Sequence, residues 1–345
     1  MSIIARTLKI RKAGKAMEWF WDIPVVARVF TMMFAGAFFL AVYNVAMKKE
    51  LKKQNIWKNR DAAIISLVMF LCSIMLFIVT VFTGGPQITS GFWFAMLATG
   101  VLNIFIQYAN TRSKALEDVS LVAPISSTTP AIVIFTSFVI LGEVPTFLGW
   151  LGIWIMAMGT YTLQIQEFWK KLSEQEGIAK YKNSRLKLWF AILFAPFLAL
   201  KKSHGVRWAF GASLLGTISM NYDGVTARTA HIAFGSACIF GITAFGNLVF
   251  FALPRGEFKG LNMRYAIKTA LWPALLFALL HLAINPAYRE SIVPYIGTLK
   301  RLQIPMTIIL AYLMIGERKN FRERLIGGTL MGIGAALIAI GMTGK

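Results

Sequence analysis

The chain has 345 residues, of which 57% are hydrophobic and only 15% are charged, and its formal net charge is +21. Soluble domains carry about 25% charged residues, so we expect lipid to cover part of the hydrophobic surface of this chain. Its Lys and Arg residues gather in short clusters between apolar runs, as at Lys48–Arg60 and Lys170–Lys187, which indicates anchoring against anionic lipid and argues against a nucleic-acid partner.

The N-terminal segment, residues 1–26, is basic and contains an aromatic patch, Trp19-Phe20-Trp21. These features predict a helix that lies in the membrane interface. No short apolar run with a cleavage site follows the basic residues, so we expect no cleaved signal peptide.

Ten predominantly apolar runs follow, each close to the roughly 20 residues that a membrane-spanning helix needs. Alternation of polar and apolar residues, which would indicate strands, is absent. The sequence therefore predicts an all-α integral membrane protein of about ten transmembrane helices, at residues 27–47, 62–83, 91–111, 119–141, 146–166, 206–226, 232–252, 265–285, 291–315 and 322–343.

A long polar stretch, residues 167–205, divides these runs into two groups of five. It contains one short apolar piece, Leu188–Leu200, which Pro196 interrupts and lysines flank. Because about 13 residues are few for a span, we expect an amphipathic helix on the membrane surface that links the two halves.

The two halves show an internal repeat. A shift of 174 positions places Gly142-Glu143 on Gly316-Glu317, Val119 on Val293 and Gln107 on His281. Five spans is an odd number, so a repeat at residues 27–166 and a second at 206–345 would be inverted relative to each other, as in many secondary transporters. The alternative is two unrelated apolar blocks that share a common Gly-Glu turn.

Two segments carry a resemblance to a known family. Val122–Leu163 contains a helix with proline, a Gly-Glu-x-Pro turn from Gly142 to Pro145 and a glycine-rich helix, and Tyr295–Met342 has the same order with a Gly-Glu turn that lacks the proline. Both resemble the ends of EamA-like domains in the drug/metabolite transporter superfamily. The resemblance implies ten helices in two inverted repeats around a central cavity, without an ATP-driven domain, and it does not name the substrate.

Lys300 and Arg301 are the most informative polar residues. They lie near the middle of the ninth span, where insertion of each charge costs about 2.5–3.5 kcal/mol. One interpretation is that both line a cavity and bind an anionic group of a solute. The alternative is a structural role, in which one side chain snorkels or an acid such as Asp223 neutralises the pair.

Polar residues near this pair extend the candidate site. Tyr295 and Thr298 precede Arg301 at intervals of three and therefore share its helix face. Ser126 and Ser127 occupy the matching place in the first half, inside a polar tract between two prolines. This tract predicts a broken helix that turns backbone groups toward a solute. The alternative is that its hydroxyls bond back to their own helix.

Gln107 and His281 occupy matching positions on the third and eighth spans, which suggests the two walls of a cavity. A buried histidine that is merely hydrogen-bonded is the alternative for His281. Asp223 is the candidate for a coupling proton or for charge balance. Gly328 and Gly332 form a GxxxG pattern, which predicts close helix packing or a dimer contact.

These features together predict a secondary transporter of a small polar, anion-bearing metabolite that works by alternating access. Two alternatives stay open: a membrane scaffold that binds without transport, and an exporter of hydrophobic compounds. We expect no enzyme, cofactor or metal, because Cys72 and Cys238 lie in apolar runs and no catalytic constellation or nucleotide-binding motif is visible. The expected partners are the lipid bilayer and the solute, and the expected state is a monomer or homodimer in the cytoplasmic membrane of a prokaryote.

Overall fold

The structure, a computed structural model, describes residues 22–53, 60–116, 125–174, 200, 203–315 and 321–343. The interfacial helix predicted at the N-terminus and the surface helix predicted at Leu188–Leu200 lie almost entirely outside these residues. Within the described residues the chain is helical and contains no strand, so the predicted all-α class is confirmed. The predicted domain boundaries and the inverted arrangement of the halves stay predictions.

Every predicted span contains a helix. Those of the first half are α3 (Val25–Lys53), α4 (Asp61–Phe82), α5 (Phe92–Leu116), α7 (Thr129–Leu141) and α8 (Phe147–Glu174). Those of the second half are α10 (His204–Thr229), α11 (Ile232–Asn247) with its π-helical extension η5 (Leu248–Ala252), α12 (Met263–Ile284), the short α13 (Ala287–Glu290), α14 (Val293–Leu299), the 3₁₀ turn η6 (Lys300–Leu302), α15 (Gln303–Ile315) and α16 (Phe321–Thr343).

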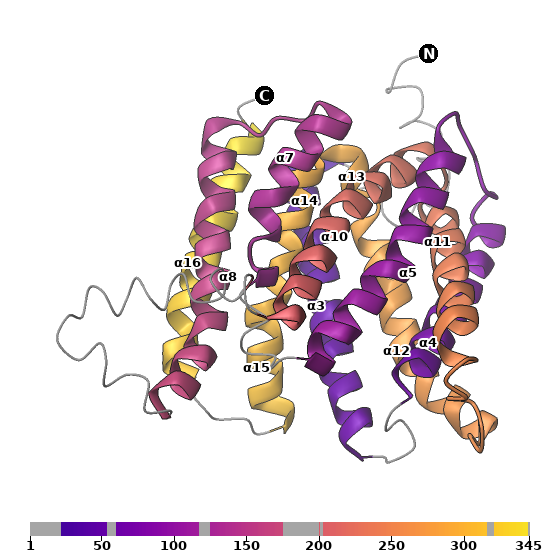
Figure 1. The fold of residues 1–345 in the computed structure, drawn as a ribbon. Coiled ribbons are helices and arrows are strands. Elements are labelled where there is room, and N and C mark those ends of the chain that lie inside the picture. Colours follow the sequence, from indigo (N-terminus) through magenta and orange to yellow (C-terminus); the bar gives the residue numbers. More distant parts are fainter. Residues whose placement is uncertain are drawn as a thin grey trace.

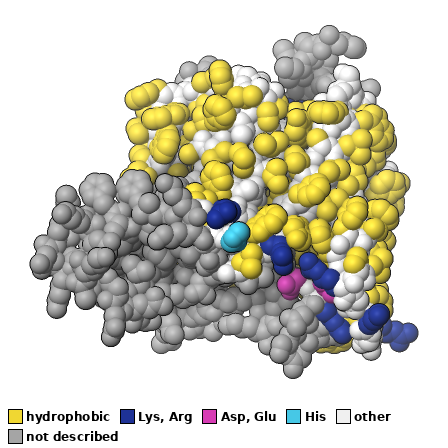
Figure 2. Space-filling model, in the orientation of Figure 1, with side chains coloured by type: hydrophobic (Ala, Val, Ile, Leu, Met, Phe, Trp, Pro, Cys, Tyr) yellow, Lys and Arg dark blue, Asp and Glu magenta, His cyan; other side chains and the backbone are white. Residues whose placement is uncertain are grey.

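Among the described residues, six helical segments are long and apolar enough to cross a membrane, and Thr129–Leu141 and Phe147–Leu163 are shorter apolar helices. Large apolar side chains cover the outer surface, for example Phe82, Phe135 and Met158, which are 85%, 68% and 62% exposed. Figure 2 shows this apolar cover over most of the visible described face, with Lys and Arg side chains gathered toward its lower edge. Such a surface is stable in lipid and would aggregate in water.

The helices run alternately up and down, so both chain ends lie at the same end of the bundle (Figure 1). The contacts between halves follow a simple order: α8 packs on α16, α5 on α10, α4 on α11, and α3 on α12 and α15. In addition, α7 packs on α10, α5 on α11, and α12 on α4. Residues from both halves therefore meet along the whole bundle.

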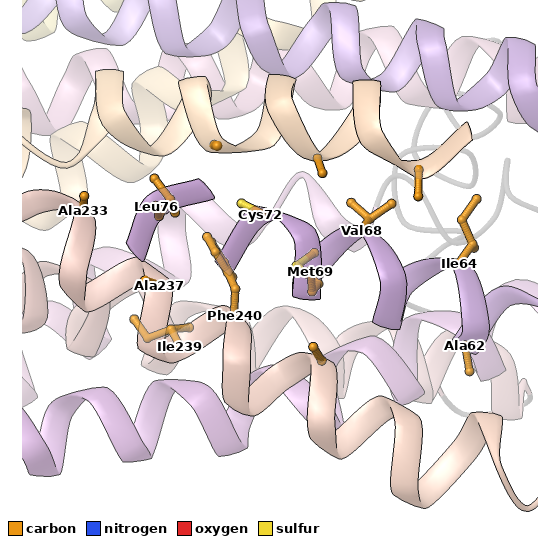
Figure 3. Packing of buried hydrophobic residues seen from close by; sticks show 14 of the residues in the cluster. Ala62, Ile64, Val68, Met69, Cys72, Leu76, Ala233, Ala237, Ile239 and Phe240 are labelled. Atoms are coloured by element: carbon orange, nitrogen blue, oxygen red, sulfur yellow. The ribbon is translucent and has the colours of Figure 1, made fainter. Parts of the chain in front are cut away.

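One core lies between α4, α11 and α12, with α4 in the middle (Figure 3). Large side chains of α4, such as Leu76 and Met69, pack with α11, which contributes both alanines and the larger Ile239 and Phe240, and with α12, whose buried residues in this core are small. On α12 these residues recur every fourth position, at Ala266, Ala270, Ala274 and Ala278, all buried. Because residues four apart share one helix face, this alanine stripe lets α12 approach α4 closely.

Glycines join α8 to α16 in a seam of direct backbone contact. A Cβ atom on Gly152 would lie 2.6 Å from the carbonyl oxygen of Gly334, and one on Gly159 would lie 2.8 Å from that of Gly327. Gly328 and Gly332, for which the sequence predicted close packing or a dimer contact, are not part of this seam, and the dimer contact stays a prediction. Gly332 has nothing within 4 Å of an added Cβ, because its face of α16 points away from α8.

Candidate functional site

A cavity of about 110 Å³ lies inside the bundle, between both halves of the chain. Its walls come from α4 and α5 of the first half and from α10, α11, α12, α13 and η6 of the second. The polar residues that line it are Asn103, Gln107, Asp223, Thr226, Ser236, Thr243, His281, Asn285, Tyr288 and Lys300. A cavity with so many polar groups at membrane depth suits a polar occupant.

Lys300 reaches the cavity from a break in the ninth span. The α-helix stops at Leu299, and Lys300–Leu302 form a 3₁₀ turn before α15 begins at Gln303. Pro305 explains the break, because it cannot donate a hydrogen bond to the carbonyl four residues earlier. The Lys300 ammonium donates to Tyr288 Oη at 3.1 Å and lies 5.4 Å from the centre of the same ring.

Asp223 lies on the cavity wall formed by α10. Thr99 of α5 donates to its Oδ1 at 2.7 Å, and the Thr99 hydroxyl also lies 2.6 Å from that of Ser219. These hydroxyls hold the carboxylate against α5. In the described part of the chain, no ion pair within 4.0 Å joins Asp223 to Lys300.

Gln107 and His281 both line the cavity, as the repeat suggested. The His281 Nδ1 atom lies 2.9 Å from the Phe277 carbonyl oxygen one turn earlier, so a neutral ring with its proton on Nδ1 fits this geometry. The ring also packs edge-on against Phe240, with 4.6 Å between ring centroids. His281 is therefore hydrogen-bonded and stacked as well as cavity-lining.

Arg301 does not line the cavity, contrary to our expectation. Its Nη2 donates to the Ser126 carbonyl oxygen at 3.0 Å, across the two halves. Ser126 and Ser127 also lie away from the cavity, and the hydroxyls of Thr128 and Thr129 bond back to carbonyls of their own segment at 2.7 and 2.6 Å. The polar tract is thus a broken helix, as predicted, but its break contacts Arg301 and not the cavity.

Tyr295 and Thr298 are also absent from the cavity wall. The Tyr295 hydroxyl accepts a hydrogen bond from the Thr146 amide at 3.0 Å, and Thr298 donates to the Pro294 carbonyl oxygen at 2.7 Å. Both side chains are buried, at 2% and 0% exposure. Tyr295 reaches α8, where its ring lies against Gly149. Likewise, α7 supplies no residue to the cavity that we expected it to border.

Charged side chains tie the helices together at the end of the bundle where α10 stops. Arg228 bonds to the Ser291 carbonyl oxygen at 2.9 Å, and Arg289 to the Ala227 carbonyl oxygen at 2.8 Å, so α10 and α13 hold each other reciprocally. Glu143 joins this contact through an ion pair with Arg228 at 2.6 Å. It also accepts a hydrogen bond from the Val293 amide at 2.7 Å, so it caps the start of α14.

Sequence reasoning missed several cavity residues, among them Asn103. Asn103 lies four residues after Thr99 and four before the predicted Gln107, and this polar stripe on an otherwise apolar helix was a signal for one wall. Tyr288 gave no comparable signal, because it lies in a connection between spans that was expected to be solvent-exposed. In the described residues, no group of three or more His, Cys, Asp or Glu side chains could hold a metal ion.

Comparison with known proteins places the first half in a family. Residues 28–164 match the model of the EamA-like transporter family. This stretch is an EamA-like transporter domain. The resemblance drawn from the sequence is confirmed here, and the EamA-like domain runs from α3 through most of α8.

A solved crystal structure, described only as that of a protein, has the same fold as this chain. The TM-score is 0.64, at 11% sequence identity, over 90% of this chain and 96% of that chain. No curated protein matches the sequence. The EamA-like domain indicates a multi-pass membrane transporter of the drug/metabolite type, a group that is generally not enzymatic.

Proposed function

We propose that this EamA-like protein is a secondary transporter of a small polar metabolite with an anionic group, and that it works by alternating access. The observation that carries this proposal is the Lys300 ammonium at the cavity wall. The location in the cytoplasmic membrane of a prokaryote stays a prediction.

Lys300 is suited to recognise an anionic group. An ammonium has three N–H donors, and one of them reaches Tyr288. No acceptor among the described residues takes the other two. A buried cation with free donors is costly unless water or a solute completes its hydrogen bonds. Carboxylate and phosphate oxygens are the acceptors that form the strongest such bonds.

The pairing of helices supports an inverted repeat. If α3, α4, α5, α7 and α8 correspond to α10, α11, α12, α15 and α16, exchanging the halves turns each of the contacts between halves described above into itself or into another of them. For example, the contact between α5 and α10 corresponds to the contact between α12 and α3. Likewise, the contact between α7 and α10 corresponds to the contact between α15 and α3. A site between two such halves is what alternating access requires.

The cavity favours this function over the two alternatives. An exporter of hydrophobic compounds would need a mostly apolar wall, whereas ten of the lining residues here are polar. A scaffold has no need for a free ammonium inside the membrane, where each charge opposes insertion.

The test is uptake of a panel of radiolabelled anionic and zwitterionic metabolites by proteoliposomes that contain the purified protein. We expect one class of solute to enter, and Lys300→Gln to reduce its uptake by about tenfold or more, because losing a hydrogen bond to a charged group costs about 1.5–3 kcal/mol. Lys268→Gln is the matched control, since Lys268 is exposed on α12. Uptake by Lys300→Gln equal to that of the unaltered protein would overturn the proposal.

A further inference from the structure

We infer that the solute is a small zwitterion, which carries an ammonium and a carboxylate on one molecule and binds between Asp223 and Lys300. This inference rests on the proposed function and adds the second charge of the solute to it. It follows from what lines the cavity and from how the two charged side chains are held.

The cavity presents one charge of each sign. Among the described residues that line it, Asp223 is the one acid and Lys300 is the one Lys or Arg side chain. Arg301, the other nearby cation, is turned to the Ser126 carbonyl oxygen. The lining is therefore close to electrically neutral before any solute enters.

Separate anchors keep the two charges from pairing directly. Thr99 donates to Asp223 Oδ1, and no donor among the described residues reaches Oδ2. Lys300 is held separately, through Tyr288. Opposite charges attract strongly in a medium of low dielectric constant, so a carboxylate and an ammonium that line one cavity without an ion pair within 4.0 Å both keep the capacity to bind a ligand there.

Charge balance then selects the ligand. A simple anion would satisfy Lys300 but would add a negative charge beside the buried carboxylate, and a simple cation would do the reverse. Leaving one buried charge without a partner costs more than the pair itself contributes. A zwitterion satisfies both side chains and brings no net charge into the membrane.

The rest of the wall fits the remainder of such a molecule. Asn103 and Asn285 carry amide groups that can bond to either end of the solute, although Asn285 already donates to the Ile232 carbonyl oxygen at 2.6 Å and to Ser236 at 2.8 Å. The rings of Phe240, Phe277 and His281 pack against one another at one side. This cluster offers an apolar surface for a side chain.

The experiment measures binding to the full-length protein in detergent by thermal shift, at a series of probe concentrations. The probes are the natural α-amino acids, each compared with the acid that lacks its amine and the amine that lacks its carboxylate. For leucine these are 4-methylpentanoate and 3-methylbutylamine. We expect at least one amino acid to bind about tenfold or more tightly than both of its analogues, a difference of ~1.4 kcal/mol.

Variants assign each end of the zwitterion. Asp223→Asn should remove the preference for that amino acid over the acid without an amine, and Lys300→Gln should remove the preference over the amine. Asp61→Asn and Lys268→Gln, at exposed positions, should keep both preferences.

Three results would overturn the inference in distinguishable ways. Equal binding of the amino acid and its deaminated acid would leave an anion transporter, so the proposed function would stand without the second charge. Equal binding of the amino acid and its amine would show that the site does not recognise the carboxylate. This result would overturn the proposed function as well as the inference. No amino acid binding more tightly than both analogues would exclude this class of zwitterion, while uptake of other anions would still test the transporter.

Discussion

Lys300 and Arg301 are neighbours in the sequence but have different surroundings. Lys300 faces the cavity and contacts one protein hydroxyl, whereas Arg301 donates to a backbone carbonyl of the other half. The Ser126 carbonyl oxygen also accepts the Thr129 hydroxyl, so Arg301 joins a helix break that is already locally bonded. The structure therefore places one cation of the pair at the cavity, where we propose that it binds the solute, and the other in a hydrogen bond between the two halves.

Arg301→Gln tests this division at the residue scale. We expect a loss of about 1.5–3 kcal/mol in the free energy of unfolding, because a charged hydrogen bond disappears, while the KM for the solute stays unchanged. Thermal unfolding and uptake, both corrected for the amount of folded protein, give the two quantities. Arg264→Gln is the control at an exposed position on α12. A raised KM with an unaltered unfolding temperature would return Arg301 to the binding site.

The candidate site could be predicted only in part. Lys300, Gln107, His281 and Asp223 were found because a polar side chain deep in an apolar run is costly and needs a reason. Tyr295 and Thr298 were misplaced because spacing identifies a shared helix face but not the neighbour that this face meets. In a membrane protein both lipid and protein neighbours are apolar, so the sequence gives little information on the rotation of a helix.

At the scale of elements, Glu143 connects three helices: it follows α7, caps α14 and pairs with Arg228 of α10. Glu143→Ala should lower the free energy of unfolding by about 1–3 kcal/mol, because the Val293 amide and the Arg228 guanidinium both lose a partner. Glu143→Gln should have a smaller effect, since the amide oxygen can still accept from Val293. Urea or thermal unfolding in detergent measures the series, and equal effects of the two changes would contradict the capping role.

The helices themselves were predictable, because a run of apolar residues of the right length has few alternatives in a membrane. The irregularities of these helices were less predictable. Pro305 is a sequence signal for a break near Lys300. However, the 3₁₀ turn at Lys300–Leu302 changes the direction of the following side chains, and a count at 3.6 residues per turn misses this change. The π-helical end of α11 at Leu248–Ala252 had no sequence signal that we recognised.

At the scale of the whole molecule, charge is distributed unequally between the two ends of the bundle. Exposed Arg255, Lys259 and Arg264 lie at the end opposite the chain termini, whereas Arg228 at the other end is engaged by carbonyl groups and Glu143. The positive-inside rule then places the end with Lys259 in the cytoplasm and both termini outside. The basic N-terminal residues point to the reverse, so a direct test of orientation decides between the two.

Cysteine labelling provides that test. In a protein with Cys72→Ser and Cys238→Ser, single changes Ser90→Cys and Lys259→Cys place a thiol in exposed loops at opposite ends. An impermeant maleimide added to intact cells should label Ser90→Cys and should reach Lys259→Cys only after lysis. The opposite pattern would mean that the termini are cytoplasmic.

The glycine seam between α8 and α16 has a mechanical consequence. Two helices in contact along their length bend less than either helix alone, and here the closest contacts at Gly152 and Gly159 are with the backbone of the partner helix. We therefore expect the two helices to move as one rigid unit. Even one added methyl group at Gly152 or Gly334 would force the backbones apart, so this rigidity depends on two residues that carry no functional group at all.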